Sequence, residues 1–301
     1  MFSGIVGHKE ALARLEKLAA SPRRAHAYLF LGPEGIGKAH IARAWASMLL
    51  GYAGNVSVHP DYYELKRVEE HILIDEVRAF IAFMQKRACM VACRVGIIAD
   101  ADRMQGPAGD ALLKTLEEPS GDRVIILSAL HRSTLSETIV SRCQIIEFSL
   151  IPDGELVAWL RLRYPDAKEE EITGAVVFAA GRAARAVAFL ENQDERAIVL
   201  EQQKSIAEVL ASGQISQAFQ WIQEMFGPLK DKDGEEKRAM AERMLLGLEH
   251  VLHAQCLKDF SYVSTDALAA FETARHALAH NVSPQQNIEQ LFLTVGGYER
   301  A

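Results

Sequence analysis

The order of apolar and polar positions divides the chain into two parts of different character. Up to about residue 150, short apolar runs alternate with segments whose apolar residues recur every three or four positions, which is typical of a parallel sheet with helices on both faces. The segment Lys38–Leu50 shows the helical spacing. The runs predicted to form strands are Tyr28–Leu31, Tyr62–Leu65, Val95–Ala99, Val124–Ser128 and Gln144–Phe148. We therefore expect an α/β domain over residues 1–150.

After this point the pattern becomes helical. Three short helices are predicted, over Gly154–Tyr164, Lys168–Ala180 and Ala183–Asn192, and longer helical patterns follow from about residue 194. Breaks are expected at Gly213 and in the polar stretch Gly227–Gly234, which is predicted to be an exposed loop. These features predict a small helical domain over residues 151–193 and an all-helical domain over residues 194–301.

The sharpest local pattern is rich in glycine and directly follows the first predicted strand. Gly32, Gly35 and Gly37 precede Lys38, where a helical pattern begins. Glycines let the backbone curl so that its N–H groups and the positive end of the helix face phosphate oxygens, while the lysine reaches the terminal phosphates. The alternative is a glycine-rich turn that binds nothing. Because strand, loop, lysine and helix come in the required order, we predict a phosphate-binding loop.

The position that would anchor magnesium beside this loop has the wrong side chain. The residue after the lysine normally carries a hydroxyl that binds the metal, and here it is Ala39, followed by His40. A methyl group cannot bind a cation. An imidazole is a poor ligand for magnesium, so His40 is expected to be solvated or packed against a helix. We predict no metal site, no required cofactor, and at most weak binding of ATP or ADP without magnesium.

The acidic residue that would hold the metal from a neighbouring strand has two candidate locations. Asp75 and Glu76 follow a short apolar run that continues at helical spacing, so they are predicted to lie at a helix N-terminus, where they complement the helix dipole. The run Val95–Ala99 has the stronger character of a central strand, but its metal position is Ala99. Asp100 occupies the neighbouring position, and the sequence leaves open whether it faces the loop.

Composition and charge narrow the class of protein further. The chain of 301 residues contains 33 Lys and Arg against 40 Asp and Glu, a net charge of -7, so only a local basic patch could bind nucleic acid. The four cysteines form no C-x-x-C pair, which argues against zinc and favours a reducing compartment. No stretch reaches the roughly 18 apolar residues of a membrane span. We therefore expect a cytoplasmic protein without a membrane partner.

Several motifs in one order resemble a known family. They are Ile5-Val6-Gly7-His8, the phosphate loop, Leu-Leu-Lys-Thr-Leu-Glu-Glu-Pro at residues 112–119 and Ser-Arg-Cys at residues 141–143. In this combination the chain resembles bacterial clamp-loader subunits of the AAA+ class, which belong to the DNA polymerase III holoenzyme. The resemblance is densest over residues 1–150 and thins in the C-terminal part, where residues 281–285 still match a family segment. It implies a P-loop AAA+ domain, a small helical lid and an all-α collar domain that joins neighbouring subunits.

The resemblance also assigns a role to Arg142. In this family the arginine of Ser-Arg-Cys reaches across a subunit boundary to ATP bound by the neighbouring subunit, so Arg142 is expected to be catalytic in trans. A guanidinium suits this role because it is always charged and offers several donors to a terminal phosphate. From the residues alone, the alternative is a surface arginine paired with a local carboxylate. The implied partners are subunits of the gamma or tau and delta types, with a sliding clamp and primer-template DNA in the assembled complex.

The chain departs from the active members of this family. The four-cysteine zinc module after the first helix is absent, and the polar sensing residue falls near Ala129 or Leu130. The second-sensor arginine aligns with Ala184, and Arg185 is expected to point elsewhere by about 100 degrees. Together with the two alanines at the magnesium positions, these losses imply a subunit that keeps the fold without turning over ATP.

Two rival hypotheses remain at this stage. One is a working ATPase of the gamma or tau type, built from Lys38 with Asp75, Asp100 or Asp102. Magnesium-dependent hydrolysis by the isolated chain would favour it. The other is a regulatory scaffold outside replication, which co-purification without clamp-loader subunits would favour.

Overall fold

The computed structural model describes residue 2 and residues 4–66, 71–91, 93–104, 106–117, 121–230, 232, 234–256, 265–279 and 283–295. Within them the chain forms two compact units. The first comprises Met1–Lys168 and Gly181–Ala186, and the second comprises Glu169–Ala180 and Val187–Ala301. The division into three domains at residues 150 and 193 stays a prediction. No helix among the described residues combines the length and apolar character needed to cross a membrane.

The first unit is built on a parallel five-stranded sheet with the order β2-β3-β4-β1-β5. Strands β1, β3 and β4 are buried along their whole length, as expected for a parallel sheet that is covered on both faces. This explains why apolar runs predicted all five strands to within one residue at each end. The strands are β1 Ala27–Leu31, β2 Tyr62–Leu65, β3 Arg94–Ile98, β4 Arg123–Ala129 and β5 Gln144–Glu147.

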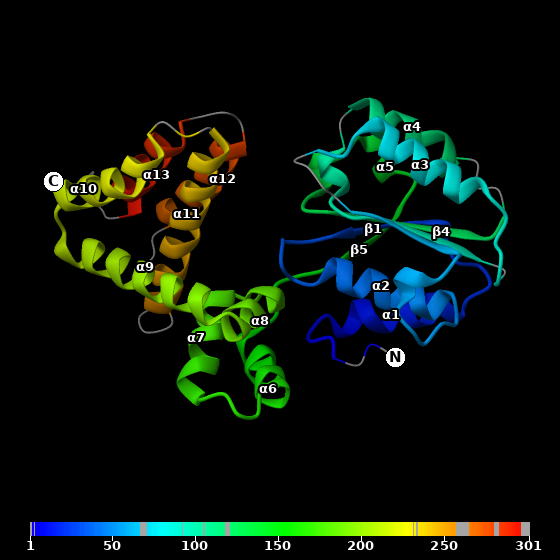
Figure 1. Cartoon of the computed structure of the whole chain (residues 1–301), viewed down its shortest axis with the longest axis horizontal. Helices are drawn as coiled ribbons and strands as arrows, with labels where there is room; N and C mark the ends of the chain where they lie inside the picture. Colours follow the sequence, from blue (N-terminus) through cyan, green and yellow to red (C-terminus); the bar gives the residue numbers. More distant parts are fainter. Residues whose placement is uncertain are drawn as a thin grey trace. The chain divides into compact units, whose positions relative to one another are not determined.

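Helices cover both faces of this sheet, which confirms the predicted α/β fold (Figure 1). On one face lie α1 Lys9–Ala20 and α2 Lys38–Leu49. On the other lie α3 Ile74–Gln85, α4 Gly106–Glu117 and α5 Glu137–Val140. Successive side chains of a strand point to opposite faces, so each strand contributes to both hydrophobic cores.

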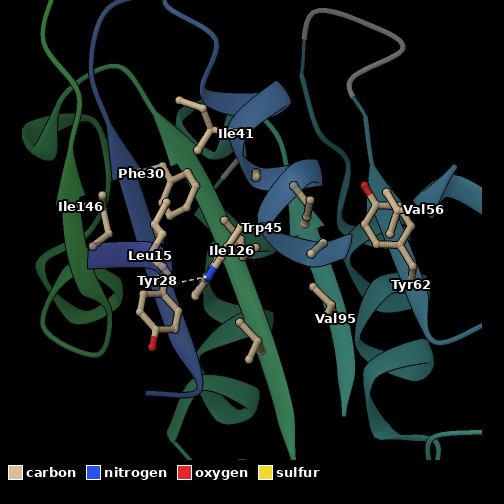
Figure 2. Close-up of a cluster of buried hydrophobic side chains, with 14 of the residues drawn as sticks. Leu15, Tyr28, Phe30, Ile41, Trp45, Val56, Tyr62, Val95, Ile126 and Ile146 are labelled. Carbon is tan, nitrogen blue, oxygen red and sulfur yellow. Dashed lines mark hydrogen bonds between the residues drawn. The ribbon is translucent and has the colours of Figure 1, made fainter. Parts of the chain in front are cut away.

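Trp45 of α2 shows how the first of these cores is assembled. Its side chain is fully buried, and its ring meets Tyr28 of β1 edge-on with 4.6 Å between centroids. Figure 2 shows the indole Nε1 donating a hydrogen bond to the backbone oxygen of Leu15, at 2.8 Å. The side chain of Trp45 in α2 therefore contacts both α1 and β1.

Three helices follow the sheet, and they confirm the helices predicted there. They are α6 Asp153–Arg163, α7 Glu169–Ala179 and α8 Ala183–Glu191. The first of them is attached within its own unit, since Trp159 Nε1 donates to the backbone oxygen of Gly4 at 3.1 Å and Lys9 pairs with Glu155 at 2.8 Å. Short 3-10 helices also occur, over Val56–Val58, Ala101–Arg103, Arg132–Thr134 and Gly227–Leu229.

The remaining helices belong to the second unit. The break predicted at Gly213 is confirmed, with Gly213 at φ 62° between the first two long helices. The stretch predicted as a loop before Gly234 begins with a 3-10 turn. Buried residues of five helices form one core, including Ile222, Leu248 and Phe292. These helices are α9 Gln193–Ser212, α10 Ile215–Phe226, α11 Gly234–Cys256, α12 Thr265–Ala279 and α13 Pro284–Val295.

Candidate phosphate-binding loop and arginine site

The glycine-rich segment forms the loop between β1 and α2. Gly32, Gly35 and Gly37 have φ values of 151°, 78° and 100°, a region that residues with side chains rarely adopt. At Gly32 a side chain is also excluded by close approach, because an added Cβ would lie 2.3 Å from the backbone oxygen of Phe148. The loop therefore has the glycine-dependent shape on which the prediction of phosphate binding rested.

Lys38 begins α2 and turns back over this loop. Its Nζ donates to the backbone oxygen of Gly32 at 2.5 Å and to that of Pro33 at 2.9 Å. Burial lowers the pKa of Lys38, and the negative charges of Asp100, Asp102 and Glu34 offset part of this effect. The residue is only 7% exposed. A phosphate on the loop would thus compete with two carbonyl oxygens for the ammonium group.

The positions expected to hold magnesium carry no ligand oxygen in their side chains. Ala39 follows Lys38 in α2, and Ala99 follows β3, with its N–H donating to the backbone oxygen of Leu65 at 3.1 Å. Among the residues that the structure describes, no group of three or more His, Cys, Asp or Glu side chains is placed to hold a metal ion. The residues present do not fit the protein-held magnesium of an active site.

Besides Glu34 of the loop, two carboxylates that follow β3 interact electrostatically with Lys38. Asp100 has a left-handed backbone, with φ 52°, and its N–H donates to the hydroxyl of Ser128 at 3.1 Å. Burial, followed by the charge of Asp100, raises the pKa of Asp102, and its Oδ1 is buried without a hydrogen-bond partner. The charge of Asp102 is thus disfavoured, although both carboxylates interact electrostatically with Lys38.

The other acidic pair lies at a helix N-terminus, as predicted. Glu76 accepts a hydrogen bond from the N–H of Leu73 at 2.8 Å, which caps α3. Asp75 accepts one from Arg78 at 3.0 Å on the exposed side of the same helix. These contacts give both carboxylates a structural role in α3.

His8 also contacts the loop, and sequence analysis did not predict this contact. Its Nε2 lies 3.3 Å from the backbone oxygen of Ile36, and its ring meets Phe148 edge-on. Burial lowers the pKa of His8, while the Ile36 carbonyl and Glu155 act in the other direction. The only sequence signal was the family motif, because the contact joins residues 28 positions apart.

The start of α8 also contacts the loop. The N–H of Ala184 donates to the backbone oxygen of Gly35 at 3.0 Å. The Cγ of Arg185 lies 3.8 Å from the place where a Cβ on Gly35 would be, and the Cβ of Arg182 lies 3.5 Å from the same place. That Arg185 points away from the direction expected of a second-sensor arginine stays a prediction.

Arg142 lies just after α5 and is held within its own chain. Its Nη2 donates to Glu117 Oε1 at 2.5 Å, and its Nη1 donates to the backbone oxygen of Thr138 at 2.8 Å and lies 3.3 Å from Ser141 Oγ. Both side chains of the ion pair are partly exposed, 33% for Arg142 and 47% for Glu117. This pair thus joins the motif at residues 112–119 to the motif at residues 141–143. Residues 118–120, which include the end of the first of these motifs, lie outside the described residues.

The sheet order, the loop after β1 and the helices that follow together define a P-loop domain of the AAA+ class. A solved structure supports this classification of the fold. The DNA polymerase III gamma subunit-related protein of Thermotoga maritima matches with a TM-score of 0.54 over 95% of this chain and 98% of its own, at 16% sequence identity.

Sequence comparison shows which members of this class the chain resembles. The family described as DNA polymerase III, delta subunit, matches residues 7–152. DNA polymerase III subunit delta′ of Pseudomonas aeruginosa is 34% identical over 182 residues, which are 55% of this chain and 56% of that relative. The Bacillus subtilis subunit delta′ is 26% identical over 91% of this chain and 84% of its own length. The chain is therefore similar to the DNA polymerase III delta′ subunits of the clamp-loader AAA+ class, and it spans about half of the length of the Pseudomonas relative.

Proposed function

We propose that this chain is a clamp-loader subunit in DNA replication that does not turn over ATP itself and supplies Arg142 to the ATP site of a neighbouring subunit. One observation carries the proposal: methyl groups stand at both magnesium positions, Ala39 and Ala99, beside a phosphate loop that is otherwise formed. Catalysis of phosphoryl transfer depends on metal ions that neutralise the developing charge. A chain without their anchors can keep the fold and act on a neighbour.

Weak nucleotide binding is compatible with this role. The loop glycines and Lys38 can hold phosphate oxygens through backbone N–H groups and one ammonium group. The carbonyl oxygens of Gly32 and Pro33 and the buried position of Lys38 oppose that binding. ATP or ADP therefore binds, if at all, without a magnesium ion held by the protein, and no cofactor is required.

The proposed partners follow from the relatives. Subunits of the gamma or tau and delta types would form the complex, and one relative with 27% identity over 189 residues is DNA polymerase III subunit tau of Bacillus subtilis. The C-terminal helices would hold the neighbouring subunits. The sliding clamp and primer-template DNA would be engaged by the assembled complex in the cytoplasm.

A second candidate function is a working ATPase, and one observation favours it. Asp100 and Asp102 both interact electrostatically with Lys38, so acidic side chains do lie near the loop. Against this candidate, the charged form of Asp102 is disfavoured by burial. A scaffold outside replication, the third hypothesis, finds no support in the family match.

ATP hydrolysis by the purified chain separates the first two candidates. We expect the chain with magnesium to hydrolyse ATP no faster than its Lys38→Ala variant, because neither protein anchor for magnesium is present. A thermal-shift titration with ATP or ADP measures binding separately, since stabilisation follows ligand concentration relative to its dissociation constant. Turnover well above background that disappears in Lys38→Ala would overturn the proposal and establish the ATPase.

A further inference from the structure

We propose that Glu117 is a latch for Arg142: its carboxylate holds the guanidinium against the same chain, and the phosphate of a neighbouring subunit must displace it. The proposal rests on the trans role of Arg142 given above and adds an intrachain competitor for that residue. It concerns Glu117 at the last position of α4 and Arg142 just after α5, two residues 25 positions apart.

The hydrogen bonds of Arg142 carry the argument. Both terminal nitrogens face acceptors of their own chain, Nη2 toward Glu117 and Nη1 toward the backbone oxygen of Thr138 and the hydroxyl of Ser141. A phosphate is bound most strongly by two parallel N–H groups of a guanidinium. To present its two terminal nitrogens together to a phosphate, Arg142 must give up its bond to Glu117.

The exposure of the pair indicates that the latch opens easily. Ion pairs between exposed side chains are weak because solvent screens them and long side chains lose freedom in them. The Asp61–Arg94 ion pair of the same unit is, by contrast, buried. Both of its side chains are at most 4% exposed, and Asp61 also accepts from the N–H groups of Cys89 and Met90. The Glu117–Arg142 pair has no such enclosure and can exchange partners.

Opening the latch requires only rotation of side chains. The ends of α4 and α5 are held by the core, because Leu116, next to Glu117, and Ile139, three residues before Arg142, are both buried. A phosphate carries more negative charge than one carboxylate and offers several acceptor oxygens, so it competes effectively once the neighbour presents it. Until then Glu117 reduces the fraction of chains with a free guanidinium, and apparent affinity falls in proportion to that fraction.

The test uses the assembled clamp loader with its ATPase subunits, and measures ATP turnover as a function of ATP concentration. Glu117→Gln keeps the shape of the side chain and removes its charge. We expect it to increase turnover at subsaturating ATP about two- to fivefold, the range that corresponds to a weak exposed ion pair. The matched control is Glu155→Gln, which removes another exposed ion pair of the same unit, with Lys9, and is expected to have no effect.

A double variant shows whether Glu117 acts through Arg142. Arg142→Ala with Glu117→Gln should have the activity of Arg142→Ala alone, since the latch has nothing left to hold. If Arg142→Ala impairs turnover but Glu117→Gln lowers it or leaves it unchanged, the latch is overturned and the trans role stands. If Arg142→Ala leaves turnover intact, the trans role itself is overturned, and the latch with it.

Discussion

Individual residues around the glycine-rich loop have roles in folding that do not depend on catalysis. Gly32 is needed because the backbone of Phe148 lies where a side chain would be, and Lys38 is held by carbonyl oxygens of the loop. Ala39 and Ala99 fill the metal positions without disturbing either feature. Structural contacts alone are therefore sufficient reason for the loop to keep its shape.

Gly32→Ala tests the structural role of the loop. The new Cβ would lie 2.3 Å from Phe148 O, so the backbone must shift, and we expect a loss of about 2–4 kcal/mol in the free energy of unfolding. Gly154→Ala in α6 is the matched control, because no atom lies within 4 Å of its added Cβ. There we expect no loss and a gain of up to about 1 kcal/mol. Urea denaturation measures both, and equal effects would contradict the argument.

Asp102 gives a prediction about pH. Because burial raises its pKa, the folded protein is destabilised by the charged form, which predominates above the folded pKa. Asp102→Asn should therefore raise the thermal midpoint at pH 7. The gain should shrink as the pH falls through the folded pKa of Asp102, and it should vanish below the ordinary value of 3.8, where the carboxyl is neutral in both states. A gain that is independent of pH would contradict this cause.

At the scale of elements, apolar runs predicted the strands well because a covered parallel sheet buries every residue of its inner strands. The glycine-dependent shape of the loop after β1 was predicted equally well, since its glycines, lysine and helix are consecutive in sequence. A local carboxylate was named as an alternative partner of Arg142, but neither its identity as Glu117 nor the approach of Arg185 to Gly35 was predicted, because each depends on how elements distant in sequence pack together. Helical spacing gives direction only relative to a helix whose own placement is known.

The attachment of α2 to the sheet is tested at Trp45. Trp45→Phe removes the hydrogen bond to Leu15 O and part of a fully buried ring, so we expect a loss of about 2–3 kcal/mol. Leu162→Ala, at a side chain that is 85% exposed, should change stability by less than about 0.5 kcal/mol. Denaturation followed by circular dichroism compares the two variants. A loss at Trp45 no larger than that at Leu162 would contradict the packing argument.

At the scale of the whole molecule, the described residues form two compact units, and the chemistry considered above lies in the first. The second unit has a helical core of its own and no assigned catalytic residue. With a net charge of -7, the chain offers no general attraction for DNA. Its proposed function therefore depends on assembly, and the trans role of Arg142 is the central claim.

The most direct test of that claim is the ATPase activity, stimulated by clamp and DNA, of a reconstituted clamp loader that carries Arg142→Ala. An arginine supplied in trans contributes about 10³–10⁵ to the rate in GTPase systems, but one silenced site among several lowers total turnover only partly. We predict normal folding and assembly with reduced turnover. Arg142→Lys should also be impaired, because an ammonium keeps the charge but loses the planar fork of donors. Full stimulated activity of an assembled complex with Arg142→Ala would contradict the account.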